Sequence, residues 1–317
     1  LREMAADETP NSRKNVSAGG GAPLINLLKE GLKDGRVEAQ EYALWSLSAI
    51  SETPAWRVDA EAIVEAGGIK PLIASLVGGK LSVVAQEHAA AVLSGLAPIG
   101  SNAQAIRAAK GIDPLVQLLL TGNAQAKEHS AVALAQLALR AQAALEIAKA
   151  GAVSAFVTWL WNPTLGPPLV AARALSEIAL DNPDTQAQMT EEGAISPLVA
   201  MVASAAETSR PEFTANMSPQ AAAKKITAAL QVSNTAAKAL ATLAKGSVVI
   251  QTTVAEENGI IPLVDLLKNS AMKPIGYENA TKALWHLAAT EDNQLAIARA
   301  GGLVPLVQLL TSGNEIT

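Results

Sequence analysis

Apolar residues recur along the chain in short runs with helical spacing, and the same run returns several times. The stretch KGIDPLVQLL at 110–119 reappears as NGIIPLVDLL at 258–267 and as GGLVPLVQLL at 301–310. Four further relatives are GGGAPLINLL at 19–28, GGIKPLIASL at 67–76, GAVSAFVTWL at 151–160 and GAISPLVAMV at 193–202. Each run places apolar residues three and four positions apart, and therefore predicts one short helix.

These seven copies define one internal period. Each has a proline at its fifth position, replaced by Ala155 in the fourth copy, and these anchors are residues 23, 71, 114, 155, 197, 262 and 305. Consecutive anchors lie 48, 43, 41, 42, 65 and 43 residues apart. One spacing dominates and one step contains an insertion, so the sequence predicts a repeat protein.

Two other segments recur with the same period. One is rich in alanine and leucine, as in SAVALAQLA at 130–138, and its small residues let a neighbouring helix approach closely. The other is short and amphipathic, and it ends at a glycine that we expect to adopt a left-handed turn before each anchor. Asp113 and Ser196 are expected to be N-caps. Each repeat is thus predicted to contain a short helix, a glycine turn, a second helix, a loop and a longer third helix.

One repeat alone is not expected to fold. About four buried aliphatic side chains in a second helix contribute roughly 1.5–3 kcal/mol each, whereas ordering costs about 1–2 kcal/mol per residue. Stacked repeats would share their apolar faces and build one continuous core.

The motifs G-[GA]-[IV]-x-P-L-V-x-L-L and A-x-x-A-L-x-x-L-A resemble the armadillo repeat over essentially the whole chain. HEAT repeats are the alternative, but they usually have two helices and lack the glycine before the proline. The armadillo resemblance implies an all-α, right-handed superhelical solenoid with about six complete three-helix repeats and partial repeats at both ends.

The predicted array is a single domain over residues 1–317. Its repeats run approximately over 6–50, 54–98, 101–139, 140–180, 182–245, 247–289 and, in part, 291–312. LREMA at 1–5 matches LSEIA at 175–179, and no third helix follows the last copy, so we expect a segment of a longer array or protein.

The fifth repeat contains the insertion, at about 203–225. The insertion is either a tolerated loop or a binding element that includes Arg210 and Phe213. A helix predicted over 219–245 either overshoots its neighbours or breaks near 232–235.

Composition narrows the functional class. The 317 residues are 50% hydrophobic but only 3% aromatic, so the core must be aliphatic. The absence of cysteine excludes disulfides, thiolate zinc sites and a cysteine nucleophile. A net charge of −5 and a pI near 5.4 argue against nucleic acid as the main partner, and no apolar run is long enough for membrane insertion.

Sequence motifs give no support for catalysis. H-E-x-x-H, G-x-S-x-G and the P-loop motif are all missing, and His88, His129 and His286 lie in separate repeats. We therefore expect no enzymatic activity, cofactor, metal or small-molecule ligand.

The resemblance implies that the third helices line a concave groove that binds an extended peptide. Nuclear import receptors of this type have W-x-x-x-N pairs, and no repeat here has both residues, which disfavours that function. The equivalent positions, with the glutamates one turn earlier, are the candidate groove residues. They are Glu41, Trp45, Ala49, Glu87, Ala91, Gly95, Glu128, Val132, Gln136, Arg173, Glu177, Lys238, Thr242, Glu278, Lys282 and His286.

Some of these residues allow two interpretations. The four glutamates at 41, 87, 128 and 278 would offer an acidic row to a basic peptide, or are solvated residues at helix starts. Trp161 is either a surface anchor for a partner or an ordinary surface residue. We expect Trp56, Trp159, Trp285 and Phe156 to pack in apolar stripes.

Two functions remain open, both with a protein partner. One is an adaptor whose groove captures an extended segment. The other is a structural component of a large assembly, such as a ciliary or membrane-tethering complex, bound through broad helical faces; AARALSEIA at 171–179 is similar to segments of ciliary armadillo proteins. A substrate-recruiting arm of a ubiquitin ligase would need a catalytic domain that these residues do not contain. The expected localisation is cytoplasmic, including a cytoskeletal or ciliary assembly.

Overall fold

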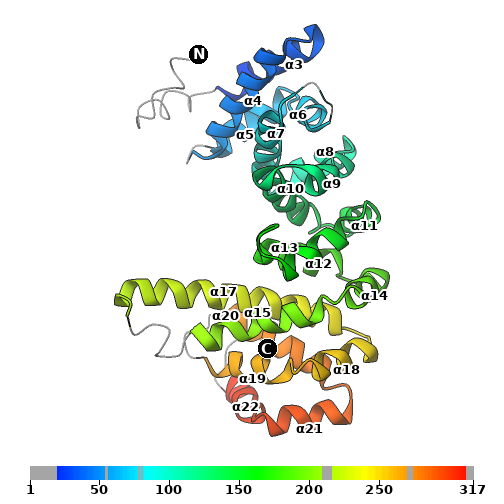
Figure 1. The fold of residues 1–317 in the computed structure, drawn as a ribbon, viewed down its shortest axis with the longest axis vertical. Helices are drawn as coiled ribbons and strands as arrows, with labels where there is room; N and C mark the ends of the chain where they lie inside the picture. The colour runs from blue at the N-terminus through cyan, green and yellow to red at the C-terminus, as the bar shows by residue number, and fades with distance from the viewer. Residues whose placement is uncertain are drawn as a thin grey trace. The chain divides into compact units, whose positions relative to one another are not determined.

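The computed structural model describes residues 20–53, 56–77, 79, 81–208, 216–269 and 274–311, which form nineteen helices and no strand (Figure 1). The helices of the first four repeats are α3 (Gly21–Asp34), α4 (Val37–Ser51), α5 (Trp56–Glu65), α6 (Ile69–Leu76), α7 (Val83–Leu96), α8 (Gly100–Ala108), α9 (Ile112–Thr121), α10 (Ala124–Leu137), α11 (Ala141–Lys149), α12 (Ala152–Trp161) and α13 (Pro168–Ile178). The remaining helices are α14 (Pro183–Glu191), α15 (Ile195–Thr208), α17 (Pro219–Ala244), α18 (Val248–Glu256), α19 (Ile260–Lys268), α20 (Pro274–Leu287), α21 (Glu291–Arg299) and α22 (Leu303–Thr311). The predicted order of first, second and third helix is confirmed.

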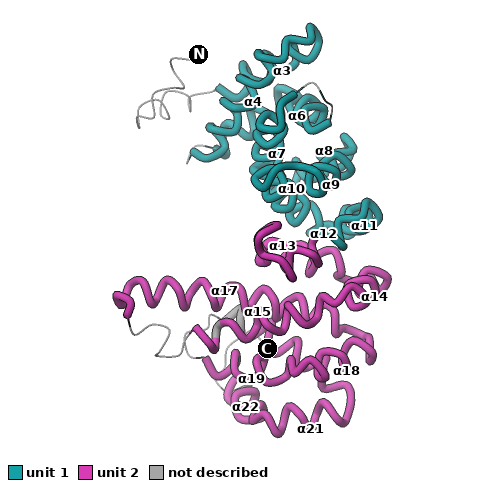
Figure 2. Tube along the Cα trace, in the orientation of Figure 1, with its two compact units in different colours: residues 1–155 teal, residues 156–317 magenta. Residues whose placement is uncertain are grey.

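The chain divides into two compact units, residues 1–155 and 156–317, with the boundary inside α12 (Figure 2). Within the first unit, the third helix α4 packs against α7, and α7 packs against α10. Within the second unit, α13 packs against α17, and α17 packs against α20. Consecutive third helices are therefore neighbours in each unit.

The core is aliphatic, as the composition predicts. Leu47, Leu93 and Leu134 occupy equivalent positions on α4, α7 and α10 and are completely buried. Ala90 and Ala131, one turn earlier on α7 and α10, are completely buried too. Small residues at these positions let the backbones of stacked third helices approach closely.

In the repeats whose turn is described, the left-handed residue lies four positions before the anchor, and it is not always glycine. Gly67, Gly151, Gly193 and Gly301 have φ between 71° and 88°, but in two repeats the left-handed residues are Lys110 (φ 58°) and Asn258 (φ 59°). The neighbouring Gly111 has φ −75°, so the prediction of a left-handed glycine is wrong there. A Cβ added at Gly111 would lie 2.8 Å from Ile106 and 3.0 Å from Ile73. Glycine is required at this position for close packing.

The N-caps also differ in part from the prediction. Helix α9 begins at Ile112 after Gly111, and α15 begins at Ile195, so Asp113 and Ser196 lie inside the first turn and are not N-caps. Ser218, by contrast, is an N-cap whose side chain accepts a hydrogen bond from the amide of Ala221.

Helix α17 is a single helix of 26 residues with no break between 232 and 235. Of the two alternatives for the helix predicted over 219–245, a third helix longer than its neighbours is the correct one. Figure 1 shows its N-terminal turns extending past α15 and α20. Arg210 and Phe213 lie outside the described residues.

Candidate functional site

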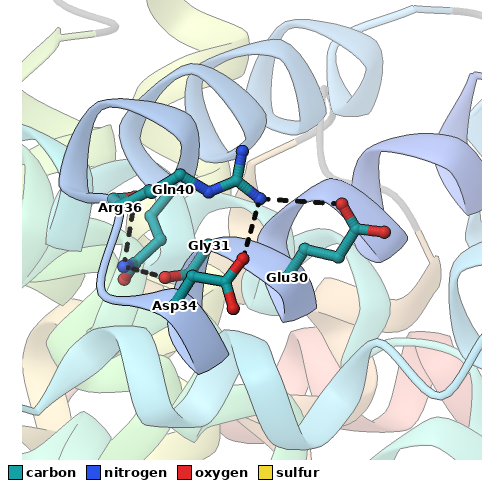
Figure 3. Close-up of polar contacts among 5 residues, drawn as sticks. All are labelled: Glu30, Gly31, Asp34, Arg36 and Gln40. Carbon is teal, nitrogen blue, oxygen red and sulfur yellow. Dashed lines mark hydrogen bonds and ion pairs between the residues drawn. The ribbon is translucent and has the colours of Figure 1, made fainter.

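The start of α4 is fixed by contacts with α3. Gln40 is buried, and its Nε2 donates hydrogen bonds to the carbonyl oxygens of Gly31 (2.8 Å) and Arg36 (3.3 Å). Arg36 forms ion pairs with Asp34 (3.2 Å) and Glu30 (3.7 Å) (Figure 3). A Cβ added at Gly31 would lie 2.9 Å from Gln40 Cγ, so the close approach of the two helices needs glycine. These contacts position the first of the third helices.

All sixteen candidate groove residues lie on third helices. Those on α4, α7 and α10 belong to the first unit, and those on α13, α17 and α20 belong to the second. In each unit, we call the surface formed by these positions the third-helix face of that unit. The exposed members are Trp45, Ala49, Glu128, Arg173, Lys238 and Lys282. Ala91, Glu177 and Thr242 are buried, so they contribute little surface to a partner.

Two glutamates of this face join consecutive repeats. The Oε1 of Glu41 accepts a hydrogen bond from the backbone amide of Ser82 (2.9 Å), the N-cap of α7. The Oε2 of Glu87 accepts one from the side-chain amide of Asn123 (2.9 Å), the N-cap of α10. Hydrogen bonds from Ser82 lower the pKa of Glu41, because they stabilise its ionised form. Glu41 and Glu87 therefore fit neither interpretation fully. They are not free to bind a partner only, and they are not simply solvated residues at helix starts.

Two basic residues of the second unit are paired as well. Lys238 on α17 forms an ion pair with Glu177 on α13, whose side chain is 8% exposed. Lys282 pairs with Glu278 one turn earlier on α20. The sequence pattern places these residues on one face but does not show that Lys238 pairs with Glu177 of the preceding repeat, because these two residues are 61 positions apart.

Arg173 differs from these lysines. It is exposed on α13, in the position equivalent to Lys238 and Lys282, and the described part of the chain gives it no ion pair. Trp45, in the same position on α4, is 37% exposed. Among the described residues, neither side chain forms a hydrogen bond or an ion pair, although Trp45 is largely covered by the chain.

Trp285 is the most exposed tryptophan, at 72%, so the prediction that it packs in an apolar stripe is wrong. Its ring lies against that of His286, with centroids 4.7 Å apart. Burial lowers the pKa of His286, and the nearby charges of Lys245 and Lys282 lower it further. The equivalent residues Ser48 and Ala241 are small and buried. The other repeats therefore gave no example of how a tryptophan is accommodated at this position.

The other aromatic residues that were predicted to pack are buried or half-buried. Phe156 and Trp159 are buried and meet edge to face, with centroids 6.0 Å apart. Trp56 is half-buried, and its Nε1 donates to the carbonyl oxygen of Gly95 (3.0 Å) on α7. A Cβ at Gly95 would lie 3.0 Å from the indole, so Trp56 covers this candidate groove position.

Trp161 is 58% exposed, yet it has a contact within the chain. Its Nε1 donates to the carbonyl oxygen of Gly193 (3.1 Å), in the turn of the following repeat. Lys29 and Lys268 lie at the same position after their anchors and donate to the equivalent turns, at Ala66 and Ala300 (3.2 Å for the second). Trp161 therefore joins two repeats, which is sufficient to explain its position.

The histidines do not assemble a reactive site. His88 and His129 are half-buried on neighbouring third helices. Burial lowers the pKa of His88, the charge of Glu87 opposes this, and the charge of His129 adds to the lowering. Among the described residues, no group of three or more acidic or histidine side chains could hold a metal ion. Within the same residues, no single helix is long and apolar enough to cross a membrane.

Comparison with known proteins identifies the fold. The sequence matches no protein-family model and no curated protein. The structure is similar to the designed armadillo repeat protein YIII(Dq)4CqI, with a TM-score of 0.64 and 22% identity over 84% of this chain and 99% of that one. A designed armadillo repeat protein in complex with the peptide (KR)4 has a TM-score of 0.60 and 21% identity, and covers 84% of this chain and 99% of its own. An engineered protein covers 99% of this chain and 80% of its own, with a TM-score of 0.64 and 28% identity.

These similarities show an all-α armadillo repeat fold. The expectation from the repeat motifs is confirmed at this level.

Proposed function

We propose that the chain is a non-enzymatic scaffold that binds an extended segment of a partner protein along its third-helix face. The observation that supports this function most directly is that Trp45 and Arg173 are exposed in equivalent positions on third helices, and that neither side chain has a hydrogen bond or ion pair among the described residues. Exposed tryptophan and arginine are the side chains most enriched among residues that dominate binding energies.

The similar designed protein that binds (KR)4 lends further support to a peptide-binding face. A wholly basic peptide fits this chain less simply. In the first unit Glu41 and Glu87 already accept hydrogen bonds from the next repeat, and Glu128 is the exposed glutamate. In the second unit, Arg173 would instead contact an acidic side chain or a carbonyl group of the partner.

The alternative is a structural component of a large assembly held through broad helical faces. Its support is a group of exposed apolar side chains on second helices, Ile261, Leu303 and Val304, each more than half exposed. Such a component would bind through these residues and would be insensitive to changes at Trp45 and Arg173.

Peptide selection tests the proposal. A random library of extended peptides is selected against the chain, and the affinities of the selected peptides for wild type and for Arg173→Glu are measured by fluorescence anisotropy. Arg299→Glu on the first helix α21 is the matched control, because Arg299 is also exposed and has no described ion pair.

Peptides bound at the second unit should lose about tenfold or more in affinity with Arg173→Glu, since reversal of a contacting charge costs more than about 1.4 kcal/mol. Arg299→Glu should change affinity by less than about twofold. Equal affinities of wild type and Arg173→Glu for every selected peptide, or a selection that yields none, would count against the proposal.

A further inference from the structure

Asp59 lies in the first turn of α5 and is completely buried. Neither of its carboxylate oxygens makes a regular hydrogen bond to a described residue, although the backbone amide of Gly21, at the start of α3, is close enough to act on the carboxylate. A buried, ionised carboxylate without partners is strongly unfavourable, because water no longer solvates its charge. The side chain therefore needs an explanation other than simple packing.

The repeats supply a comparison. Asp59 stands twelve residues before its anchor Pro71, and the same position is occupied by Asn102 and Asn293 in two other repeats, both buried. The Nδ2 of Asn293 donates hydrogen bonds to the carbonyl oxygens of Leu287 (2.9 Å) and Gln251 (3.3 Å). An amide at this position is neutral and can donate. An ionised carboxylate is charged and can only accept.

The carbonyl that corresponds to Leu287 belongs to Ile50, the residue in the equivalent position of α4. It accepts hydrogen bonds from the backbone amide (3.0 Å) and the hydroxyl (2.8 Å) of Thr53. The loop between α4 and α5 thus satisfies this carbonyl without Asp59. As a result the carboxyl group at 59 is left without the interaction that its counterpart in the last repeat makes.

Among the described residues, no charged group forms an ion pair with Asp59. Helices α3 and α4 pack against α5, and their charged side chains are Lys29, Glu30, Lys33, Asp34, Glu38 and Glu41, none within ion-pair distance of Asp59. On α5 itself, Arg57, Glu61 and Glu65 are exposed. Helix α7 reaches α5 at Trp56, and its titratable groups are Glu87 and His88.

Two effects act on the protonation of Asp59. Burial raises its pKa, and the backbone amide of Gly21, at the start of α3, opposes this by favouring the ionised form. The net pKa is raised. Because the folded chain binds this proton more tightly than the unfolded chain, the contribution of Asp59 to stability is greatest at low pH and is lost as the pH rises.

We propose that Asp59 is a pH-sensitive switch at the junction of α3, α4 and α5. Protonated, it is a neutral side chain in a buried position where other repeats use a neutral amide. Ionised, it destabilises the packing of α5 against α3 and α4. The device is independent of the proposed binding function, although α4 also carries Trp45.

Thermal unfolding followed by circular dichroism, from about pH 8 down to about pH 4, the ordinary pKa of an aspartate, tests the switch. Asp59→Asn supplies the neutral isostere found in other repeats, and Asp59→Ala supplies the residue found at the buried equivalent position 143. Asp113→Asn on α9 is the control, because Asp113 is an exposed aspartate in the first turn of a helix in the same unit.

The melting temperature of Asp59→Asn should exceed that of wild type by about 2–4 °C at pH 8, and the difference should shrink as the pH falls toward the ordinary pKa of an aspartate, about 4. The difference between Asp59→Ala and wild type should change with pH in the same direction, whatever its size. Asp113→Asn should differ from wild type by a constant amount. Differences that are independent of pH for both Asp59 variants would overturn the proposal.

Hydrogen exchange gives a local readout at fixed pH. At pH 8, amides of α5 in Asp59→Asn should exchange several-fold more slowly than in wild type, and those of α19 should be unchanged. Faster exchange of α5 in the asparagine variant would show that the ionised carboxylate stabilises this junction, and would overturn the proposal.

Discussion

Glu177 and Lys238 illustrate how single residues connect the repeats. The side chain of Glu177 is 8% exposed, whereas that of Lys238 is 46% exposed, so the pair joins a buried carboxylate to a partly hydrated ammonium group. Glu41 and Glu87 make comparable links through hydrogen bonds to the N-caps of the next third helices. Many polar residues of the third-helix face thus hold α-helices together, and a smaller number remain for a partner.

Lys238→Met should destabilise the second unit, because it leaves the buried carboxylate of Glu177 without its cation. The expected loss is about 1–2 kcal/mol in the free energy of unfolding, at the low end for a buried charged group since water reaches the site of Lys238. Urea unfolding followed by circular dichroism measures it. Lys224→Met, an exposed lysine on the same helix, should change stability by less than about 0.5 kcal/mol.

Adding Glu177→Gln to the Lys238→Met variant should recover part of the lost stability, because an amide needs no counter-ion. Equal unfolding midpoints for Lys238→Met and Lys224→Met would show that the ion pair contributes nothing.

The sequence predicts positions of single residues better than their partners. The periodicity of the sequence correctly predicts that Phe156 and Trp159 are buried. It also predicts that Arg173, Lys238 and Lys282 lie at equivalent positions on third helices. It could not show that Trp161 donates to Gly193, because that contact depends on the distance between adjacent repeats. Trp285 lies in an apolar stripe, which predicts burial, but the equivalent residues Ser48 and Ala241 are small, and the tryptophan is 72% exposed.

At the level of helices, the repeat pattern predicts order and type well and boundaries less well. A proline in the first turn predicts N-caps at Asp113 and Ser196, but α9 and α15 begin one residue before these positions. Lys110 and Asn258 adopt the left-handed conformation where glycine was expected, because the adjacent glycine is needed for close packing against the preceding helix. Close packing between helices therefore determines which of two neighbouring residues is glycine, and local turn preferences alone do not.

Leu115→Asp tests the packing of a second helix. Leu115 on α9 is completely buried, so a charge there should destabilise the first unit by several kcal/mol and lower the thermal melting temperature. Leu120→Asp is the matched control, since Leu120 lies on the same helix and is 44% exposed. The control should melt close to wild type. Equal melting of the two variants would contradict the assignment of α9 to a core shared between repeats.

At the scale of the whole molecule, one armadillo repeat fold is organised as two compact units, each with its own row of packed third helices. The repeats predict this fold because seven copies of one motif each show the same spacing of apolar residues, glycine and proline. They did not predict the two units, because the period hardly changes at residue 155. The repeat pattern does not predict the identity of the partner either, since recognition depends on the few exposed residues that vary between repeats.

Site-specific photo-cross-linking tests most directly whether the third-helix face binds a partner. The photoreactive residue p-benzoylphenylalanine replaces Val132, a half-buried residue of this face on α10, or Leu145, an exposed residue of the first helix α11 in the same unit. A peptide selected for binding to the first unit is added and irradiated, and the products are identified by mass spectrometry. We expect a cross-link from position 132 and none from position 145; a cross-link from position 145 alone would contradict binding at the third-helix face.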